Sequence, residues 1–298
     1  MKNMSINRRE MLRGAALLGG ASVIGILGNG AFSFGAEDKP AQDAVAKLGW
    51  RIGPQIYSFN RFPFDVAIKK VKETGSTSFE LYSGQQLRKV ENGRRVAVGP
   101  GLAGDDYKYF QDLIAETGCK PHAMGVCPAD RAHFEFAVKL GLSVLNVEPK
   151  FDKIPEVNKL AEEYKIKVGL HNHPRPSIYW DPDIVLGQLK DSGKWVGACC
   201  DTGHWLRSGL DPLECVKKFK GRIVSFHIKD LSKKDKNFVF VPLGAGDCKI
   251  AEILREVATQ EVKIPFSIEY EAEWDNNVKP ITESVEFFRK TASSLATK

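Results

Sequence analysis

The sequence lacks the cysteine spacing of small metal-stabilised folds and the charge pattern of nucleic-acid-binding proteins. Its 6 cysteines form no CxxC pair and no zinc-ribbon spacing. A chain of 298 residues, 43% of them apolar, can bury a large core without disulfides. No dense run of lysine and arginine with interleaved aromatic residues is present, and the formal net charge is +6. This mild balance gives no indication of a nucleic-acid partner.

Phosphate-binding motifs and interdomain linkers are missing as well. Neither GxGxxG nor GxxxxGKS/T follows the first predicted strand, which argues against a nucleotide-binding open sheet. After a polar stretch at 37–48, no segment rich in proline, glycine or serine interrupts the chain. We therefore predict one domain over residues 49–298.

Long apolar runs are limited to the N-terminal segment. Residues 14–28 form an apolar run that is too short and too glycine-rich for a stable membrane-spanning helix. The pair Arg8-Arg9 precedes the run, and small residues suitable for cleavage follow at 33–36. This pattern resembles a twin-arginine export signal, with Asn7 at the position that serine or threonine usually occupies.

The N-terminal pattern leads to a prediction about processing and location. We predict a twin-arginine-type signal peptide over residues 1–36, a linker over 37–48, and a periplasmic mature protein that is not bound to a membrane. The signal carries four basic residues and one acid, so its removal lowers the formal net charge from +6 to +3. Phosphorylated sugars are retained inside cells, so the mature protein would meet unphosphorylated ones.

Apolar runs that alternate with longer amphipathic segments predict an α/β fold. The predicted strands are residues 52–59, 78–82, 120–126, 143–149, 167–173, 196–202, 223–230 and 266–271. The predicted helices are residues 64–74, 105–117, 131–141, 154–164, 181–191, 211–220, 250–259 and 281–296. This alternation is typical of a (β/α)8 TIM barrel, with an open doubly wound sheet as the alternative. Two polar insertions, 83–101 and 231–247, are predicted after strands 2 and 7, the first as a hairpin or loop over the barrel mouth.

Polar side chains stand near the carboxyl ends of five consecutive predicted strands. They are Glu148, His171 with His173, Asp201 with His204 just beyond it, His227, and Glu269 with Glu271. In a TIM barrel these strand ends meet in one mouth, where catalysis takes place. Each residue alone is more often a structural group, because a buried polar group is tolerated when it is paired. Together they predict a divalent metal site, and oxygen and imidazole ligands without thiolate suit Mn²⁺, Mg²⁺, Zn²⁺ or Co²⁺.

Four short motifs carry a resemblance to a known family. LHNHP, CDTGHW, HIKD and IEYE occur in this order between residues 170 and 271. In order and spacing they resemble the sugar phosphate isomerase/epimerase family, the xylose isomerase-like or endonuclease IV-like barrels. The resemblance implies that Asp201, His227 and Glu269 are metal ligands. It also implies that His204 and Lys229 contact substrate oxygens.

His171 departs from this family pattern. Most relatives have a glutamate there that binds metal and also moves a proton, and an imidazole cannot be assumed to fill both roles. Glu148 on the neighbouring strand is a candidate base or further ligand, and the sequence leaves open which of the two binds metal. The predicted metal ligands are Glu148, His171, Asp201, His227 and Glu269, with Mn²⁺ as the preferred ion. The predicted catalytic residues are Glu148, His171, Glu269 and Lys229, and the predicted substrate contacts are His173, His204, Lys229, Trp205 and Arg207.

The tract EPK, HNHP, DTGHWLRSG and HIKD resembles in particular an exported branch linked to cleavage of 3-keto-glycosides by elimination. HIKD also resembles the keto-inositol dehydratases, which eliminate water. Family enzymes remove a proton beside a carbonyl while a divalent cation stabilises the enolate. His171 and Glu269 form an unsymmetrical pair, which favours one-way removal of the C2 proton and loss of the C1 aglycone, with Lys229 or His204 as proton donor. We therefore predict a 3-keto-glycoside 1,2-lyase that acts on a small carbohydrate.

Several alternatives stay open. The main one is a sugar isomerase or epimerase acting on free ketoses or aldoses. DNA repair is disfavoured by the export signal and the weak charge, and a non-catalytic sugar-binding protein is disfavoured by the five polar strand ends. Tyr57, Phe62 and Trp180 are interpreted as barrel packing in preference to sugar contacts. The sequence does not decide between a monomer and a homodimer.

Overall fold

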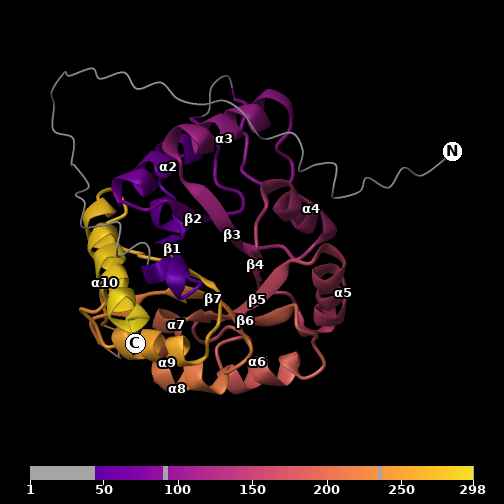
Figure 1. The fold of residues 1–298 in the computed structure, drawn as a ribbon. Helices are drawn as coiled ribbons and strands as arrows, with labels where there is room; N and C mark the ends of the chain where they lie inside the picture. Colours follow the sequence, from indigo (N-terminus) through magenta and orange to yellow (C-terminus); the bar gives the residue numbers. More distant parts are fainter. Residues whose placement is uncertain (1–43, 90–92, 234–236, 298) are drawn as a thin grey trace. The chain divides into compact units, whose positions relative to one another are not determined.

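Eight strands form the centre of the molecule, with helices around them (Figure 1). The computed structural model describes residues 44–89, 93–233 and 237–297. The strands are β1 (Arg51–Pro54), β2 (Ser78–Leu81), β3 (Lys120–Cys127), β4 (Val144–Val147), β5 (Lys167–His171), β6 (Val196–Asp201), β7 (Ile223–Ile228) and β10 (Pro265–Ile268). They pair in parallel in the order β1-β10-β7-β6-β5-β4-β3-β2. The predicted (β/α)8 barrel is confirmed.

A shorter contact between β1 and β2 brings the two edges of this sheet together. Gln55 and Glu80 form an isolated parallel bridge. Ser78 Oγ donates a hydrogen bond of 3.0 Å to the carbonyl oxygen of Ile52. The backbones approach so closely that a Cβ atom at Gly53 would lie 1.7 Å from the carbonyl oxygen of Ser78. Only glycine fits at this position of the barrel wall.

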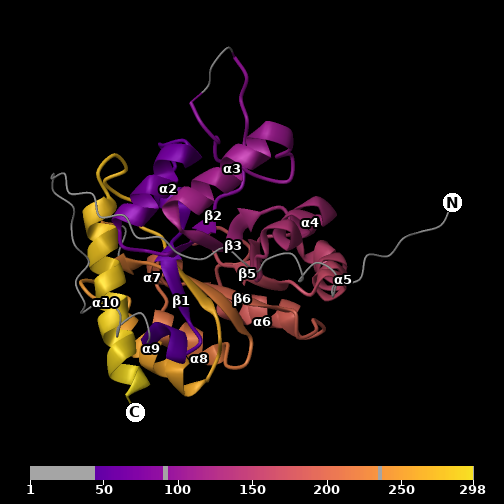
Figure 2. The same ribbon diagram turned by 45° about the horizontal axis from the view of Figure 1, so that its top comes forward.

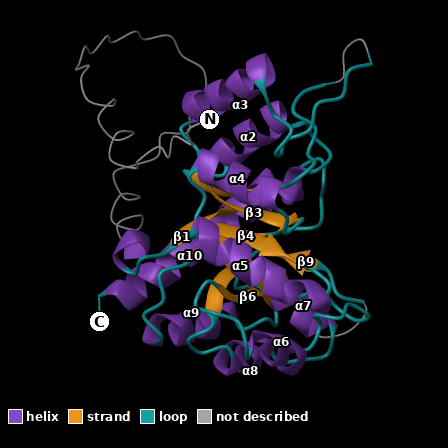
Figure 3. Cartoon of the chain, turned by 90° about the vertical axis from the view of Figure 1, so that its right-hand side faces the viewer, coloured by secondary structure: helices purple, strands orange, loops and turns teal. Residues whose placement is uncertain are grey.

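The helices cover the outside of the strands (Figure 3). They are α2 (Phe64–Glu73), α3 (Gly104–Thr117), α4 (Arg131–Leu140), α5 (Ile154–Tyr164), α6 (Pro182–Leu189), α7 (Thr202–Arg207), α8 (Pro212–Lys218), α9 (Ile250–Thr259) and α10 (Val278–Ala296). The buried residues of α9 show the expected spacing, with Ile250, Ile253, Leu254 and Val257 turned toward the strands. Helix α7 was not predicted, because six residues are too few to show a helical repeat.

Most of the predicted strands end earlier in the structure than the sequence pattern suggests, and the first and seventh lead into other elements. The segment predicted as strand 52–59 leaves the sheet at Pro54, and η1 (Ile56–Phe59) follows as a 3₁₀ helix. The side chain of Gln55 accepts a hydrogen bond of 2.8 Å from the Tyr57 N–H and so caps this turn. The segment predicted as strand 223–230 ends at Ile228. Beyond it, β8 (Asp230–Leu231) pairs antiparallel with β9 (Phe240–Val241).

The described residues of the predicted insertion 83–101 form two antiparallel arms that extend from the molecule near α3 (Figure 2). Gln86 and Ala97 form an antiparallel bridge between the arms. The Phe64 N–H at the start of α2 donates to the Gln86 carbonyl oxygen at 2.7 Å. Arg88 and Asp106 on α3 form an ion pair of 2.6 Å. These arms thus pack on the ends of α2 and α3. None of the described residues of the insertion lines the cavity that contains His171 and His227.

The predicted export signal, residues 1–36, and most of the predicted linker lie outside the described residues. Of the linker, residues 44–47 are helical, and Ala44 and Val45 are buried. The end of this segment is therefore part of the fold. Within the described chain, none of the helices combines the length and the apolar character needed to cross a bilayer.

Candidate metal centre

Four side chains meet at the carboxyl ends of the strands. His171 ends β5, Asp201 ends β6, His227 lies in β7, and Glu269 follows β10. One donor atom from each lies within 4.8 Å of the others. The parallel register places Asp201 opposite His227 on the neighbouring strand. All four side chains are buried, and even Glu269 is only 8% exposed.

Each of these side chains directs toward the others a buried atom that makes no hydrogen bond of good geometry with a described residue. The atoms are His171 Nε2, Asp201 Oδ2, His227 Nδ1 and Glu269 Oε2. Two of the four atoms form ion pairs with Lys229 Nζ, and His227 Nδ1 lies 2.9 Å from Glu269 Oε2. Buried polar atoms without a hydrogen bond cost free energy, so such a group requires an explanation. A divalent cation would satisfy all four, and two imidazole nitrogens with two carboxylate oxygens suit Mn²⁺, Co²⁺, Zn²⁺ or Mg²⁺. The residues present therefore fit a divalent metal ion.

The second nitrogen of each histidine is held by a carboxylate. His171 Nδ1 lies 2.7 Å from Glu148 Oε1, and His227 Nε2 lies 2.9 Å from Glu80 Oε1. Such contacts fix the tautomer of a metal-binding histidine and orient its ring. Glu148, predicted as base or ligand, thus contacts the face of His171 turned away from the four-residue centre. In the four-residue centre His171 offers Nε2, while Glu148 contacts its other nitrogen. Glu148 also belongs, with His171 and His173, to a second group of side chains that could hold a metal ion.

The motif CDTGHW is explained by the way β6 joins α7. Asp201 Oδ1 accepts a hydrogen bond of 2.9 Å from the His204 N–H and caps the helix, which leaves Oδ2 directed inward. The Thr202 hydroxyl both accepts from the Lys229 N–H at 2.9 Å and donates to the Lys229 carbonyl oxygen at 2.7 Å. A Cβ atom at Gly203 would lie 2.8 Å from Lys229 Cβ. Asp201, Thr202 and Gly203 therefore each have a geometric reason for their place in the motif.

Lys229 is buried beneath the centre, with its side chain 1% exposed. Its Nζ lies 2.9 Å from Asp201 Oδ2, 3.0 Å from Glu269 Oε2 and 2.5 Å from Glu271 Oε1. Burial alone would lower the pKa of Lys229, but these three carboxylates raise it well above its usual value. Lys229 therefore stays cationic, which suits charge neutralisation rather than proton donation.

Glu80 is a functional residue that the sequence analysis missed. It lies in β2 with no exposure, and it accepts hydrogen bonds from Asn146 Nδ2 at 2.9 Å and Ser267 Oγ at 2.5 Å. Burial tends to raise the pKa of Glu80, but His227 and these donors hold it below its usual value. The signal in the sequence was an acid inside the short apolar strand 78–82. Because Glu80 lies inside the strand and not at its end, it does not belong to the pattern of polar strand ends.

Replacing Glu80 by glutamine is expected to weaken metal binding about 10- to 100-fold, because the support of a metal-binding histidine is lost. Titration calorimetry with Mn²⁺ measures the affinity directly and independently of any activity. Glu163→Gln, an exposed acid that pairs with Arg131 on the outer surface, serves as the matched control. An unchanged Mn²⁺ affinity in Glu80→Gln would show that Glu80 does not position His227.

A cavity of 340 Å³ opens above the centre. Its lining comprises Gln55, Tyr57, Tyr82, Gly125, Val126, His171, His173, Pro174, His204, Arg207, His227, Glu269 and Glu271. Trp205 is not part of it: the indole is 1% exposed and stacks on Phe219 with ring centroids 5.9 Å apart. Trp205, which was predicted to contact the substrate, therefore lies in the core, because this position of α7 faces inward. Tyr57 does line the cavity, which corrects its interpretation as barrel packing alone.

Glu148 also holds the more exposed His173. Its Oε1 contacts His173 Nδ1 as well as His171 Nδ1, and the His173 side chain is 45% exposed at the mouth. Burial tends to raise the pKa of Glu148, but the bonds from the two histidines lower it to about 2. The carboxylate is therefore ionised and engaged twice, and the free edge of the His173 ring belongs to the cavity.

His204 lies between two cations. Its Nδ1 is 3.4 Å from Arg207 Nη1, and its Nε2 is 3.3 Å from Lys229 Nζ. Burial lowers the pKa of His204 well below its usual value, and the Lys229 charge lowers it further, against the opposing effect of Asp201. His204 is therefore a neutral imidazole whose ring lies 4.9 Å from that of His173.

The fold and the four converging donor atoms define a TIM-barrel protein with a candidate divalent-metal centre at the carboxyl ends of its strands. A family model described as xylose isomerase-like TIM barrel matches residues 68–291. The chain belongs to the xylose isomerase-like TIM barrel family, which confirms the family resemblance. The narrower resemblance to the 3-keto-glycoside branch stays a prediction.

Individual relatives match this chain at low identity. An inosose dehydratase of Bacillus cereus, named inosose dehydratase 2, is 26% identical over 135 residues, 40% of this chain but only 45% of that protein. An uncharacterized protein from Parabacteroides distasonis is 27% identical, with a TM-score of 0.63 over 81% of this chain and 99% of its own. A xylose isomerase-like TIM barrel protein from Mycobacterium smegmatis, in complex with magnesium, has a TM-score of 0.68 over 84% of this chain and 99% of its own. At 15% identity this last likeness shows the fold alone.

Proposed function

We propose that this protein is a divalent-metal-dependent enzyme that enolises a carbonyl sugar, and specifically a 3-keto-glycoside 1,2-lyase. The observation that carries the proposal is the lack of symmetry about the metal centre. A carboxylate, Glu269, stands on one side, whereas the other side has His171 and the Glu148–His173 pair. An unsymmetrical pair suits proton removal from one face followed by loss of a leaving group. A dehydratase among the relatives supports elimination as the reaction type.

The four-residue centre would hold the metal ion, for which we propose Mn²⁺. When bound, a divalent cation polarises the substrate carbonyl and stabilises the developing enolate by several kcal/mol. Lys229 supplies a permanent positive charge next to Asp201 and Glu269. This charge limits the repulsion between the two carboxylates, so that they stay close together whether or not the ion is present.

His173 is the best-placed base for the C2 proton. The Glu148 contact selects the tautomer in which Nδ1 carries the hydrogen, and in that tautomer Nε2 has a lone pair that can accept a proton. The C2–H bond breaks toward Nε2, the C1=C2 double bond forms, and the C1–O bond to the aglycone breaks. The same imidazolium then returns the proton to the aglycone oxygen, so no further acid is consumed. Glu148 itself is a weak base because its pKa is about 2.

Other residues of the cavity wall bind and orient the sugar. Arg207 offers guanidinium donors to substrate oxygens at the mouth. Tyr57 and Tyr82, whose ring centroids lie 4.9 Å apart, present aromatic surface on the β1–β2 side of the cavity. The carbon-bound hydrogens on one face of a sugar ring would pack against these aromatic rings.

The location of the enzyme follows from the N-terminal pattern. We propose that the chain is exported through the twin-arginine pathway and acts in the periplasm, where unphosphorylated glycosides are available. Fusion of residues 1–48 to a reporter that is active only after export measures this independently of the reaction. A reporter that remains inside the cell, or Arg8→Lys/Arg9→Lys exporting as well as the natural pair, would count against it.

The lyase is tested with the 3-keto derivative of 4-nitrophenyl glucoside. Purified protein with Mn²⁺ is expected to release 4-nitrophenol, and a chelator is expected to stop the release. Chromatography of the sugar products identifies the unsaturated keto sugar. Recovery of an epimer or isomer with no free 4-nitrophenol would reject the lyase in favour of the isomerase or epimerase.

In the same assay, His173→Ala is expected to lower kcat about 10²- to 10⁴-fold, the usual contribution of a general base. Its metal content should match that of the wild type if the ion is held by the four inward-facing donors; a loss of metal would indicate that the group Glu148, His171 and His173 holds the ion instead. Lys159→Gln on the outer face of α5 is the control for handling and expression. A His173→Ala variant with undiminished kcat would assign the base to another residue.

A further inference from the structure

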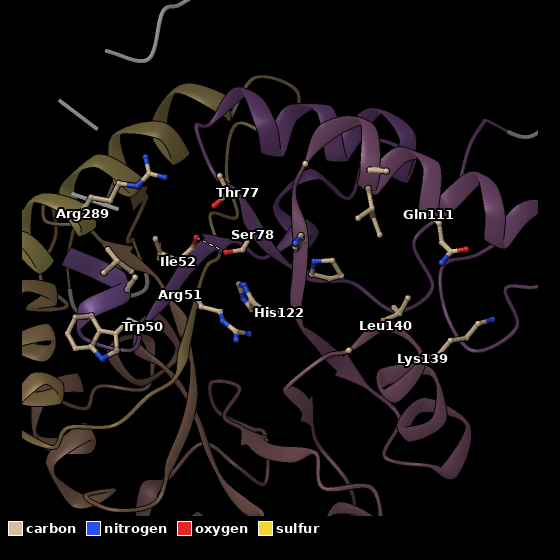
Figure 4. A pocket seen from close by; sticks show the side chains of 18 of the residues that line it. Trp50, Arg51, Ile52, Thr77, Ser78, Gln111, His122, Lys139, Leu140 and Arg289 are labelled. Atoms are coloured by element: carbon tan, nitrogen blue, oxygen red, sulfur yellow. Dashed lines mark hydrogen bonds between the residues drawn. The ribbon is translucent and has the colours of Figure 1, made fainter. Parts of the chain in front are cut away.

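A second and larger cavity lies at the opposite end of the barrel, where the strands begin (Figure 4). Its volume is 880 Å³. Arg51, Ser78 and Lys120, the first residues of β1, β2 and β3, line it. Residues of α3, the carboxyl end of α4 with Lys139, and Arg289 on α10 form further parts of the wall. We refer to this cavity as the amino-end groove.

The groove carries positive charge. Arg51, Lys120 and Lys139 contribute to its lining, and none of the described residues that line it is acidic. No ion pair joins these three cations to another described residue; Lys139 Nζ instead lies 3.4 Å from the Tyr107 ring centroid. With Arg289 of α10, four cationic residues line this cavity, which disfavours a cationic ligand and favours an anion.

His122 forms part of the groove lining and has an unsatisfied atom. The side chain is 1% exposed, and Nδ1 has no hydrogen-bond partner among the described residues. Figure 4 shows the ring beside the Arg51 side chain. The pKa of His122 is lowered to about 4, mainly by burial, so the ring is neutral. A buried neutral imidazole nitrogen without a partner is uncommon and calls for a ligand or ordered water.

The direction of the hydrogen bonds shows which partner Nδ1 requires. Ser267 Oγ donates its hydrogen to Glu80 Oε2 across 2.5 Å. Ser267 Oγ then has only lone pairs for His122 Nε2, at 3.0 Å, and Nε2 must carry the imidazole hydrogen. The remaining nitrogen, Nδ1, is therefore an acceptor. It requires a donor such as a hydroxyl group, which a simple carboxylate, sulfate or chloride ion does not have.

We propose that the amino-end groove binds a hydroxylated carboxylate, a sugar acid. Its carboxylate lies between Arg51 and Lys120, and one of its hydroxyl groups donates to His122 Nδ1. This site is separate from the metal centre and does not depend on the proposed lyase reaction, since the two cavities share no lining residue.

The test is isothermal titration calorimetry of metal-free, full-length protein with sodium gluconate as the probe. Wild-type protein is expected to bind gluconate, and Arg51→Gln/Lys120→Gln is expected to weaken the affinity about tenfold or more, because charge-assisted hydrogen bonds are lost. Both residues are exposed, so the variant should fold normally. Lys159→Gln/Lys190→Gln removes the same charge from the surface far from the groove and should leave the affinity unchanged. Hexanoate, which has the same carbon count and charge but no hydroxyl groups, should bind about tenfold more weakly.

Two further measurements locate the ligand. The ¹⁵N resonance of His122 Nδ1 should shift on addition of gluconate, as expected for a nitrogen that accepts a new hydrogen bond. Asp201→Asn, which alters the metal centre, should retain gluconate binding. Binding that is lost in Asp201→Asn but retained in Arg51→Gln/Lys120→Gln would place the ligand at the metal centre and overturn the proposal. Hexanoate binding as tightly as gluconate, or no gluconate binding at all, would also overturn it.

Discussion

Replacing Asp201 by asparagine is expected to remove the metal ion and to lower turnover about 10³-fold or more. The substitution keeps the size of the side chain and the cap on α7, because the amide oxygen still accepts from the His204 N–H. It removes one of two anionic ligands and directs an amide group at Lys229 Nζ, 2.9 Å from the present Oδ2. Loss of several kcal/mol of enolate stabilisation corresponds to three or more decades in rate.

Metal content after dialysis, measured by mass spectrometry, and release of 4-nitrophenol give two independent readouts of Asp201→Asn. Asp181→Asn is the matched control. Asp181 caps α6 through a bond of 2.8 Å from the Asp183 N–H, and asparagine serves equally well there. If Asp201→Asn retained one equivalent of Mn²⁺ at the wild-type affinity, the four-residue centre would not be the metal site.

Replacing Lys229 by methionine is expected to lower the free energy of unfolding of the metal-free protein by about 3–5 kcal/mol. Lys229 is the buried partner of Asp201, Glu269 and Glu271, and its loss leaves uncompensated negative charge in the barrel. The loss should be smaller with saturating Mn²⁺, because the ion neutralises the carboxylates that Lys229 neutralises in its absence. Turnover should fall as well, since the orientation of Asp201 and Glu269 depends on that charge.

Urea unfolding with chelator and with Mn²⁺ measures both effects. Lys217→Met is the control, because Lys217 forms an exposed pair of 2.7 Å with Glu214 and should cost less than about 1 kcal/mol. An equal destabilisation of Lys229→Met with and without Mn²⁺ would show that the ion does not contact the carboxylates around Lys229. If Lys229→Met unfolded with the same free energy as the wild type, Lys229 would not compensate the charge of these carboxylates.

The positions of strands and helices were predictable because the barrel alternates two short-range periods. Apolar runs of strand length and amphipathic segments of helix length follow each other with little interruption, and each needs only its neighbours to be recognised. The ends of the strands were predicted less well than their positions. The segment 52–59 is mostly apolar, but Pro54 lacks an N–H and the Gln55 side chain caps a turn. Whether the Gln55 side chain caps a turn or the backbone continues the strand depends on local geometry.

Candidate site residues were found where a motif marks them and missed where none does. Asp201, His227 and Glu269 stand at strand ends in a family pattern, so their convergence could be expected. Glu80 stands inside a strand, and its partner His227 is 147 residues away. The opposite error was made at Trp205, which was predicted to contact the substrate but is buried. Its closeness to Asp201 in sequence does not reveal which side of α7 faces the cavity.

The sequence alone determined the barrel, its family and the group of polar strand ends, because period, order and spacing are local properties of the chain. The tertiary structure alone decided which atoms face one another. It gave His171 Nε2 to the metal centre and Nδ1 to Glu148, and it buried Lys229 among three carboxylates. Hydrogen bonds and ion pairs act over a few ångströms between residues far apart in sequence, so they are fixed only when the strands close into a barrel.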